Sequence, residues 1–346
     1  MAGIGLIVNP LSGSNLRDPR AADRLARVLG PHGVVREARV IEDLYRVAAE
    51  FRKLEIDVLA ISGGDGTSGV TITGFLDVYA GSPLPQFALL RGGTINAIAA
   101  SIGLRRGGPD SLLGRLVNDY RARRSALPDV ERHVLGIRTR DARPSVSVHP
   151  SMPALAMKYG FLFGTGVVYG FLAEYYSASS RTPAVAGKTL LRAAASTLVR
   201  GPMIRRMARP FRGSVELADG SLWEERDYLS IAGGTVAQIG LGFSPFHRAT
   251  ERPGTFHLLG IHASPFGFLR QLSRIRKGQP MRPGHAYEAL VERVTVRSSA
   301  YPLKYMLDGD LYESEGPLDV SIGPTVRLIV PDITAKHAAS AAKKPQ

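Results

Sequence analysis

Three short apolar runs in the first third of this 346-residue chain each end in a glycine-bearing turn, and each turn precedes a helical pattern. Strand, tight turn and helix in regular succession are typical of an open parallel α/β sheet. Ligands of such sheets bind at the carboxyl ends of the strands, where all three turns fall. The runs are residues 4–8, 58–61 and 87–90, and the turns are residues 9–14, 62–67 and 91–96.

The turn at residues 62–67 combines the groups that a phosphate site requires. Its three glycines let the backbone approach a phosphate closely, and the following helix N-terminus adds free N–H groups. Thr67 can bind a phosphate oxygen, whereas the Asp65 carboxylate repels phosphates unless it holds Mg²⁺ or takes a proton. A plain turn in which Asp65 caps the helix is the alternative. The glycines are Gly63, Gly64 and Gly66.

The other two turns follow the same design. Their glycines leave space for a ligand beside the backbone, and neighbouring polar side chains can contact a nucleotide. Neither turn is specific alone, but three of them at one sheet edge favour a nucleotide site. The chain lacks a Walker A pattern and a GxGxxG turn after Val8, which argues against a P-loop NTPase and an NAD dehydrogenase. The residues in question are Asn9, Ser12, Gly13, Gly93, Thr94 and Asn96.

The pattern changes near residue 128. Residues 1–128 are predicted to form a nucleotide-binding α/β domain, and residues 129–316 a β-rich antiparallel second domain with inserted helices. The Ala/Lys-rich tail, residues 335–346, is expected to be disordered. Expected strands of the second domain include residues 134–139, 156–163, 228–232 and 294–297, and the expected helix spans residues 189–207.

Composition limits the class of protein. The formal net charge of +14 implies an anionic partner, which is a nucleotide, a nucleic acid or an acidic membrane surface. The absence of cysteine excludes a disulfide framework, thiol catalysis and a Cys-ligated metal, and it fits a reducing compartment. No apolar run approaches the ~20 residues of a membrane span. Residues 1–10 indicate a buried strand rather than a signal peptide.

Residues 175–215 contain no Asp or Glu, but basic residues interleave there with apolar ones. This pattern is typical of an amphipathic segment on an anionic bilayer, worth ~1 kcal/mol per basic residue near the surface. A solvated basic face is the alternative, and nucleic acid is not expected because no binding motif is present. The histidines, among them His247, His257 and His262, show no metal-ligand spacing, and we expect packing or surface roles for them.

The three turns, in this order, resemble the signature of the diacylglycerol kinase catalytic domain family, which includes sphingosine and ceramide kinases. Gly-Gly-Asp-Gly-Thr alone is shared with NAD kinases and phosphofructokinases, but the flanking motifs are more specific. The motifs are Asn-Pro-x-Ser-Gly at 9–13, Gly-Gly-Asp-Gly-Thr at 63–67 and Gly-Thr-x-Asn-Ala at 93–97. Residues 240–245, residues 307–310 and Pro331 are similar to later motifs of that family, so the resemblance spans nearly the whole chain.

The resemblance implies a nucleotide domain of NAD-kinase-like topology, a β-rich second domain and an active site in the cleft between them. The last strands, about 317–334, would return to the first domain. ATP and Mg²⁺ would be the cofactors, and the γ-phosphoryl group would pass to a lipid hydroxyl. The implied ATP-binding residues are Asn9, Ser12, Gly13, Gly63, Gly64, Asp65, Gly66, Thr67, Gly93, Thr94 and Asn96.

Four acidic residues receive roles from the resemblance. Asp308 matches the aspartate of the family's Asp-Gly-Glu motif and is the expected base, although Asp-Gly is also a favoured hairpin turn. Asp65 is the rival base, as in the sphingosine kinase branch, or a metal ligand. Asp310 replaces the usual Glu and is the other expected metal ligand. Glu174 lies near the headgroup contacts of sphingosine kinases and is a candidate substrate residue, with a solvated helix position as the alternative.

Two departures from the family pattern concern the substrate and a structural metal. Ala97 follows Asn96, as in sphingosine kinases, where many bacterial members have Asp. Residues 251–256 stand where bacterial members often carry an Asp-Gly pair linked to a structural Mg²⁺. No acidic residue adjoins Gly254, so that structural metal is not expected here.

The sequence therefore predicts an ATP-dependent lipid kinase that phosphorylates diacylglycerol or a sphingoid base at a membrane surface, within phospholipid or other lipid metabolism. Its expected location is cytoplasmic, peripheral at the inner face of the membrane, with residues 175–215 on the anionic lipid. A homodimer is compatible with the sequence. The alternatives are an NAD-kinase-like kinase of a soluble acceptor and an inactive nucleotide- or lipid-binding regulator. Intact Asp65, Thr67, Asn96 and Asp308 argue against an inactive protein.

Overall fold

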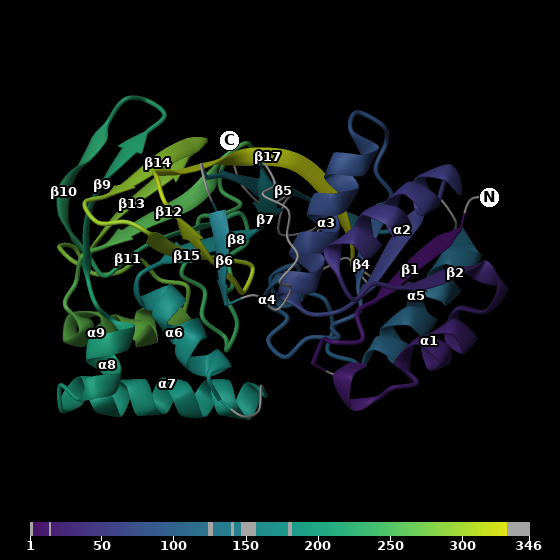
Figure 1. The fold of residues 1–346 in the computed structure, drawn as a ribbon, viewed down its shortest axis with the longest axis horizontal. Coiled ribbons are helices and arrows are strands. Elements are labelled where there is room, and N and C mark those ends of the chain that lie inside the picture. Colours follow the sequence, from purple (N-terminus) through teal and green to yellow (C-terminus); the bar gives the residue numbers. More distant parts are fainter. Residues whose placement is uncertain are drawn as a thin grey trace, which may run out of the picture.

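The computed structural model describes residues 3–13, 15–123, 127–139, 142–146, 157–178 and 182–330. The predicted disordered tail, residues 335–346, lies outside these ranges, as do residues 179–181 of the basic segment. The two halves of the chain lie side by side, with the N-terminal half on the right of Figure 1 and the second half on the left.

The helices and strands alternate in the first half, and strands dominate the second. The helices are α1 (Ala21–Leu29), α2 (Ile41–Lys53), α3 (Asp65–Tyr79), α4 (Ala97–Ser101), α5 (Pro109–Arg123), α6 (Val167–Tyr176), α7 (Pro183–Leu198), α8 (Pro202–Met207) and α9 (Pro265–Arg276). The strands of the first half are β1 (Ile4–Val8), β2 (Gly33–Glu37), β3 (Val58–Ser62), β4 (Gln86–Leu89) and β5 (Asp129–Arg138). The later strands are β6 (Ala142–Val146), β7 (Lys158–Gly160), β8 (Leu162–Thr165), β9 (Phe211–Leu217), β10 (Leu222–Tyr228), β11 (Ser230–Gly234), β12 (Phe256–Ile261), β13 (Ala286–Val291), β14 (Arg293–Ser298), β15 (Leu303–Leu307), β16 (Asp310–Ser314) and β17 (Leu318–Ile329).

The first half forms the predicted open parallel sheet. Its strands run in the order β4-β3-β1-β2, and every neighbouring pair is parallel. β1 and β3 are completely buried, because helices cover both faces and leave no side chain exposed to water. Each strand end then delivers its turn to the same edge of the sheet.

The second half contains an antiparallel sheet with the order β13-β12-β11-β8-β15-β16-β6. Helices α6, α7, α8 and α9 lie together below this sheet in Figure 1, with α7 along the outer rim. The predicted β-rich antiparallel part with inserted helices is therefore confirmed.

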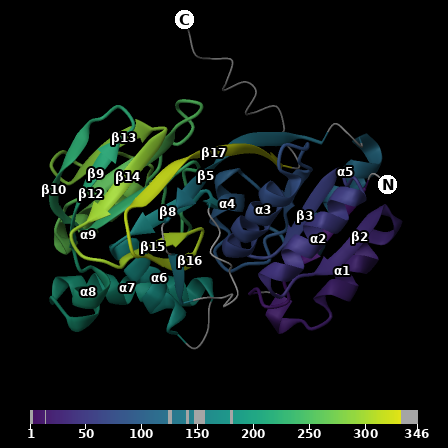
Figure 2. The same ribbon diagram turned by 45° about the horizontal axis from the view of Figure 1, so that its top comes forward.

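β17 connects the two halves. Leu328 of β17 pairs in parallel with Phe87 of β4, and Val320 pairs antiparallel with Val294 of β14. The strand crosses the top of the molecule in Figure 1, and Figure 2 shows it running from one half to the other; β5 runs antiparallel beside it. The boundaries at residues 128 and 316 stay a prediction, since one sheet continues through both parts.

Two predicted elements are each divided in two. The single helix expected over residues 189–207 is α7 followed by α8, because Pro202 disfavours a helical conformation at Gly201 and Arg200 adopts a φ of 50°. The strand expected over residues 156–163 is β7 followed by β8. The backbone N–H of Phe161, between them, donates to the Asp308 carboxylate at 3.0 Å instead of to a neighbouring strand.

The aromatic cluster of the first half supplies a test of the packing. The Phe75 ring, fully buried on α3, lies 6.5 Å from that of Phe51, 5.4 Å from that of Tyr79 and 6.3 Å from that of Phe87. Phe75→Ala should lower the free energy of unfolding by about 3–5 kcal/mol, measured by urea denaturation with circular dichroism. Phe266→Ala, on a side chain that is 47% exposed, should change it by no more than about 0.5 kcal/mol. Equal effects of the two substitutions would contradict this packing.

Candidate active site

The three predicted turns meet at the carboxyl ends of β1, β3 and β4. The Asn9 side-chain amide donates to Thr67 Oγ1 at 2.9 Å, which joins the first turn to the second. A Cβ atom on Gly93 would lie 2.3 Å from the Cα atom of Gly64, so the second and third turns touch backbone to backbone. Glycine is required at this contact because any side chain would separate the turns.

Asn15 fixes the first turn, although the sequence analysis did not identify it. It is buried, and its side-chain amide donates to the backbone oxygens of Asn9 at 2.9 Å and Ser62 at 3.0 Å. The Ser12 hydroxyl also donates to the Asn9 backbone oxygen, at 3.0 Å. These bonds hold the end of β1 against the end of β3.

Asp65 connects the second turn to the third. Its carboxylate accepts the backbone N–H groups of Ala97 at 2.8 Å and Ile98 at 3.1 Å, at the first turn of α4. Asn96, directly before this helix, has a φ of 52°, and its side chain bonds both backbone groups of Gly93. Asp65 therefore does act as a helix cap, as the simpler interpretation of its motif expected, but for a helix 32 residues away.

Asp308 and Gly309 form the two-residue turn between β15 and β16. Both have positive φ, 48° and 96°, which is the conformation that favours Asp-Gly hairpins. The turn places the Asp308 carboxylate in the protein interior, where it accepts the backbone N–H groups of Phe161 at 3.0 Å and Leu162 at 2.9 Å. The carboxylate is thus held at a fixed position.

The first turns of α3 pack against this hairpin. A Cβ atom on Gly66 would lie 2.8 Å from Asp310 Oδ1, and one on Gly69 would lie 2.9 Å from Asp308 Oδ2. Two glycines one helical turn apart thus admit two carboxylates from the other half of the chain. This close approach places Asp65, Asp308 and Asp310 around a single site.

The environment of these acids favours their neutral forms. Burial raises the pKa of Asp308 well above its usual value; the N–H groups of Phe161 and Leu162 oppose this rise, and the neighbouring carboxylates of Asp65 and Asp310 add to it. Burial also raises the pKa of Asp65 and raises that of Asp310 to about 7. Within the described ranges, the Asp310 carboxylate makes no hydrogen bond, so its oxygens remain available to a ligand.

A buried lysine also belongs to this region and was not predicted. Burial lowers the pKa of Lys158 to about 8, and its Nζ lies 5.2 Å from the centre of the Tyr312 ring. Lys158, Asp308 and Asp310 line one small pocket. Nothing in the sequence around β7 distinguishes Lys158 from an exposed lysine, because a short strand has too few residues to show which side chains face the interior.

A cleft of about 650 Å³ lies between the two halves of the chain, a size typical of small-molecule sites. Arg17, an exposed cation that the sequence analysis missed, also lines it. Gly63 and Asn96 do not line the cleft but support the turns that do. The predicted residues along it are Asn9, Ser12, Gly13, Gly64, Asp65, Gly66, Thr67, Gly93, Thr94, Asp308 and Asp310.

Glu174 lines neither this cleft nor the apolar cavity described next. It lies on α6, and its carboxylate is 3.7 Å from Nη2 of Arg206 on α8. Its role as a substrate contact stays a prediction.

An apolar cavity of about 190 Å³ lies among the helices of the second half, next to the cleft. Among the described residues that line it, only Thr197 has a polar side chain, and this hydroxyl is bonded within α7 to the backbone oxygen of Ala193 at 2.8 Å. The cavity and the cleft share four lining residues, Ile95, Leu172, Ile239 and Met306. No local sequence pattern predicted the cavity, because its lining comes from many separate segments.

The donor set of the cleft fits a hard cation. Asp65, Asp308 and Asp310 supply carboxylate oxygens, the ligands that Mg²⁺ prefers, and no nitrogen or sulfur ligand lies among the predicted site residues. Three carboxylates beside phosphate groups would repel them without such a cation.

Comparisons with known proteins identify a similar family and a similar fold. The model of the family described as diacylglycerol kinase catalytic domain matches residues 3–125. The crystal structure of a diacylglycerol kinase from Bacillus anthracis str. Sterne aligns over 95% of this chain and 96% of its own, with a TM-score of 0.58 at 13% identity. Two further structures from that organism have TM-scores of 0.59 at 14% and 13% identity. A search of curated proteins finds no match.

Asp310 should make stability depend on pH. Its pKa is about 7 in the folded protein against 3.8 as the ordinary value, so its contribution to stability is full below about pH 4 and is lost as the pH rises through about 7. Asp310→Asn removes this loss. In metal-free buffer, the unfolding free energy of Asp310→Asn minus that of the wild type should be larger at about pH 8 than at about pH 5, measured by urea denaturation. A difference that is the same at both pH values would contradict the raised pKa of Asp310.

Proposed function

We propose that this chain, whose residues 3–125 belong to the diacylglycerol kinase catalytic domain family, transfers the γ-phosphoryl group of ATP to a lipid hydroxyl at a membrane surface. The single observation that carries the proposal is that the apolar cavity adjoins the cleft: the two share four lining residues, and the three aspartates line the cleft. A lipid could then place its chain in the cavity and its hydroxyl near these acids.

The nucleotide would bind on the N-terminal side of the cleft. The turns at residues 9–13, 63–67 and 93–96 meet there, and glycines at their contacts allow close approach of a phosphate. The N-terminus of α3 adds a favourable dipole for anions. Mg²⁺ bound by Asp65 and Asp310 would neutralise phosphate charge, and the free carboxylate of Asp310 is the better placed of the two for that role.

Asp308 is the proposed base. Two backbone N–H groups fix its carboxylate, and its raised pKa makes it a stronger proton acceptor than an ordinary aspartate once it is ionised. It lines the cleft, as a base in contact with the acceptor hydroxyl must. Asp65 also has a raised pKa and remains the alternative base. Its carboxylate, however, already accepts a backbone hydrogen bond at the start of α4.

The acceptor is proposed to be a lipid because the cavity next to the cleft offers almost no hydrogen-bonding group. A soluble, polar acceptor would lose its bonds to water there without replacing them. An acyl or sphingoid chain instead gains about 0.8 kcal/mol for each buried CH₂ group. Diacylglycerol and a sphingoid base both satisfy this requirement.

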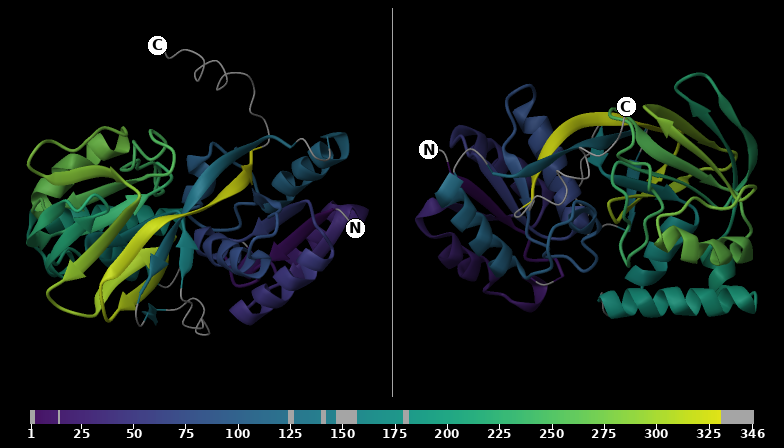
Figure 3. Two further views of the ribbon diagram at one scale, coloured as in Figure 1. Left: turned by 90° about the horizontal axis from the view of Figure 1, so that it is seen from above. Right: turned by 180° about the vertical axis from the view of Figure 1, so that it is seen from behind.

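Helix α7 provides the proposed membrane surface. Its outward side combines exposed apolar and basic residues, and α8 adds further exposed arginines. The rim position of α7, seen from behind in Figure 3, leaves this side uncovered by the rest of the described chain. The apolar residues are Leu191, Leu198 and Val199, which are 72%, 65% and 77% exposed. The exposed basic residues of α7 and α8 and the residues that follow them are Lys188, Arg192, Arg200, Arg205, Arg206 and Arg209.

A surface site of this kind needs no spanning segment. Among the described helices, none has the length and apolar character to cross a bilayer. The other face of α7 packs on the cavity, so a lipid chain would have a short path from the bilayer into the protein.

Incubating the protein with labelled ATP, Mg²⁺ and a total lipid extract tests the function. We expect one class of lipid to acquire a phosphate, identified by mass spectrometry. Asp308→Ala should reduce the rate at least about 100-fold, because it removes the base, while ATP binding persists. Asp219→Ala, in an exposed turn, is the matched control and should retain the wild-type rate.

Two results would contradict the proposal. Phosphorylation of soluble acceptors but of no lipid would indicate a kinase of a soluble substrate, and nucleotide binding without any transfer would indicate an inactive regulator. Full activity of Asp308→Ala would exclude Asp308 as the base and leave Asp65 as the candidate.

The membrane surface predicts a specific binding defect. The variant with Leu191, Leu198 and Val199 all changed to Ala should bind phosphatidylglycerol vesicles at least about tenfold more weakly than the wild type, because three inserted side chains are shortened. Vesicle sedimentation measures the effect, and neutral phosphatidylcholine vesicles should bind poorly in both cases. Leu222→Ala, on the β10 strand and 61% exposed, controls for the loss of an exposed leucine elsewhere. Unchanged binding of the triple variant would exclude α7 as the contact surface.

A further inference from the structure

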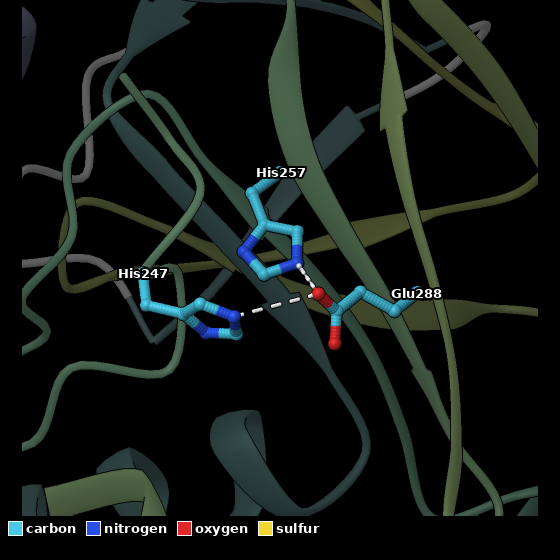
Figure 4. A group of neighbouring side chains, drawn as sticks. All are labelled: His247, His257 and Glu288. Atoms are coloured by element: carbon cyan, nitrogen blue, oxygen red, sulfur yellow. Dashed lines mark ion pairs between the residues drawn. The ribbon is translucent and has the colours of Figure 1, made fainter. Parts of the chain in front are cut away.

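Two histidines and a glutamate converge on the antiparallel sheet (Figure 4), and none of the three lines the cleft that holds the aspartates. His257 lies on β12 and Glu288 on the adjacent strand β13, where Glu288 pairs with Leu259 and therefore shares the face of His257. His247 comes from the segment between β11 and β12. Its ring points toward the same Glu288 oxygen.

The two separations between the glutamate and the histidines are close to those in a tetrahedral metal site. Glu288 Oε1 lies 3.2 Å from His257 Nε2 and 3.5 Å from His247 Nε2. Ligands about 2.05 Å from a tetrahedral zinc ion lie about 3.3 Å from one another. One ligand atom from each residue falls within 4.8 Å of the other two.

His257 lacks the partners that a buried histidine normally has. Its side chain is fully buried, and neither ring nitrogen makes a hydrogen bond of acceptable geometry to any residue that the structure describes, although Nε2 is close to Glu288. A buried polar group without a bond costs about 1–3 kcal/mol, so such groups usually have a ligand. A metal ion bound by Nε2 would meet that need.

Arg248 is the basic residue that faces the carboxylate of the cluster. Arg248 Nη1 is 3.6 Å from Glu288 Oε1 and is the competing cation. Its guanidinium is already engaged with Glu251, at 2.8 and 3.0 Å, which leaves Glu288 able to bind a metal.

We propose that His247, His257 and Glu288 bind a zinc ion whose fourth position is taken by water. Two imidazole nitrogens and one carboxylate oxygen are a common zinc ligand set with one open position. The side chains of His247 and Glu288 are 20% and 24% exposed, which gives the ion a path from solvent. This donor set differs from that of an Mg²⁺ site built on aspartate. Residues 251–256 contain no aspartate that could form such a site.

The ion would fasten the segment before β12 to the β12–β13 pair. Pro245 and Phe246, directly before His247, line the apolar cavity, and the Phe246 ring lies 6.1 Å from that of His257. Zinc would therefore stabilise one wall of the cavity without contacting its contents. This inference stands independently of the proposed kinase activity.

The test measures metal binding by the full-length, tag-free protein. After exposure to zinc and dialysis, the wild type should retain about one equivalent by elemental analysis, and zinc should raise its melting temperature. With Co²⁺ in place of Zn²⁺, the visible absorption of a tetrahedral site should appear. His247→Ala and Glu288→Gln, both at partly exposed positions, should weaken zinc binding by more than about 100-fold and abolish the cobalt spectrum.

Two control variants locate the bound metal. His285→Ala removes a histidine outside the cluster and should bind zinc as the wild type does. Asp310→Asn removes a carboxylate of the cleft and should also retain the ion. A wild type that retains no zinc would overturn the proposal, and so would retention by His247→Ala and Glu288→Gln equal to that of the wild type. Loss of the metal in Asp310→Asn alone would assign it to the cleft instead and would equally overturn the site.

Discussion

The hydrogen bonds between the Asp308 carboxylate and the backbone of Phe161 and Leu162 organise the rest of the site. They end β7, begin β8 and hold the hairpin turn at the place where α3 carries Gly66 and Gly69. A buried carboxylate is unfavourable unless several donors surround it, and these N–H groups reduce that cost. At the cleft, the two halves of the chain thus approach closely because two glycines leave room for this acid and for Asp310.

Three acids in one cleft have an electrostatic consequence. Burial raises the pKa of all three carboxyl groups, and the neighbouring carboxylates of Asp65 and Asp310 raise that of Asp308 further. A divalent cation held by these residues would oppose the effect, because it would favour the ionised acids.

Much of the N-terminal half could be predicted from sequence, because each glycine turn there follows a continuous apolar run and precedes a helical pattern. The contact between the three turns could also be predicted, since the carboxyl ends of neighbouring parallel strands lie at the same edge of a sheet. Contacts between distant segments could not be predicted in this way. Lys158, the apolar cavity and the cluster of His247, His257 and Glu288 depend on strand register and on which face a residue occupies. The histidines lie ten residues apart, a spacing that has no meaning as a metal motif until β12 and the preceding segment are placed side by side.

β17 carries a mechanical consequence for the cleft. It pairs with β4 of the parallel sheet near one end and with β14 near the other, and β5 accompanies it across the gap. A hinge motion that separated the two halves widely would have to break the hydrogen bonds between these strands, whereas twisting about β17 would leave them intact. The strand pairs formed by β17 therefore oppose a wide separation of the walls of the cleft.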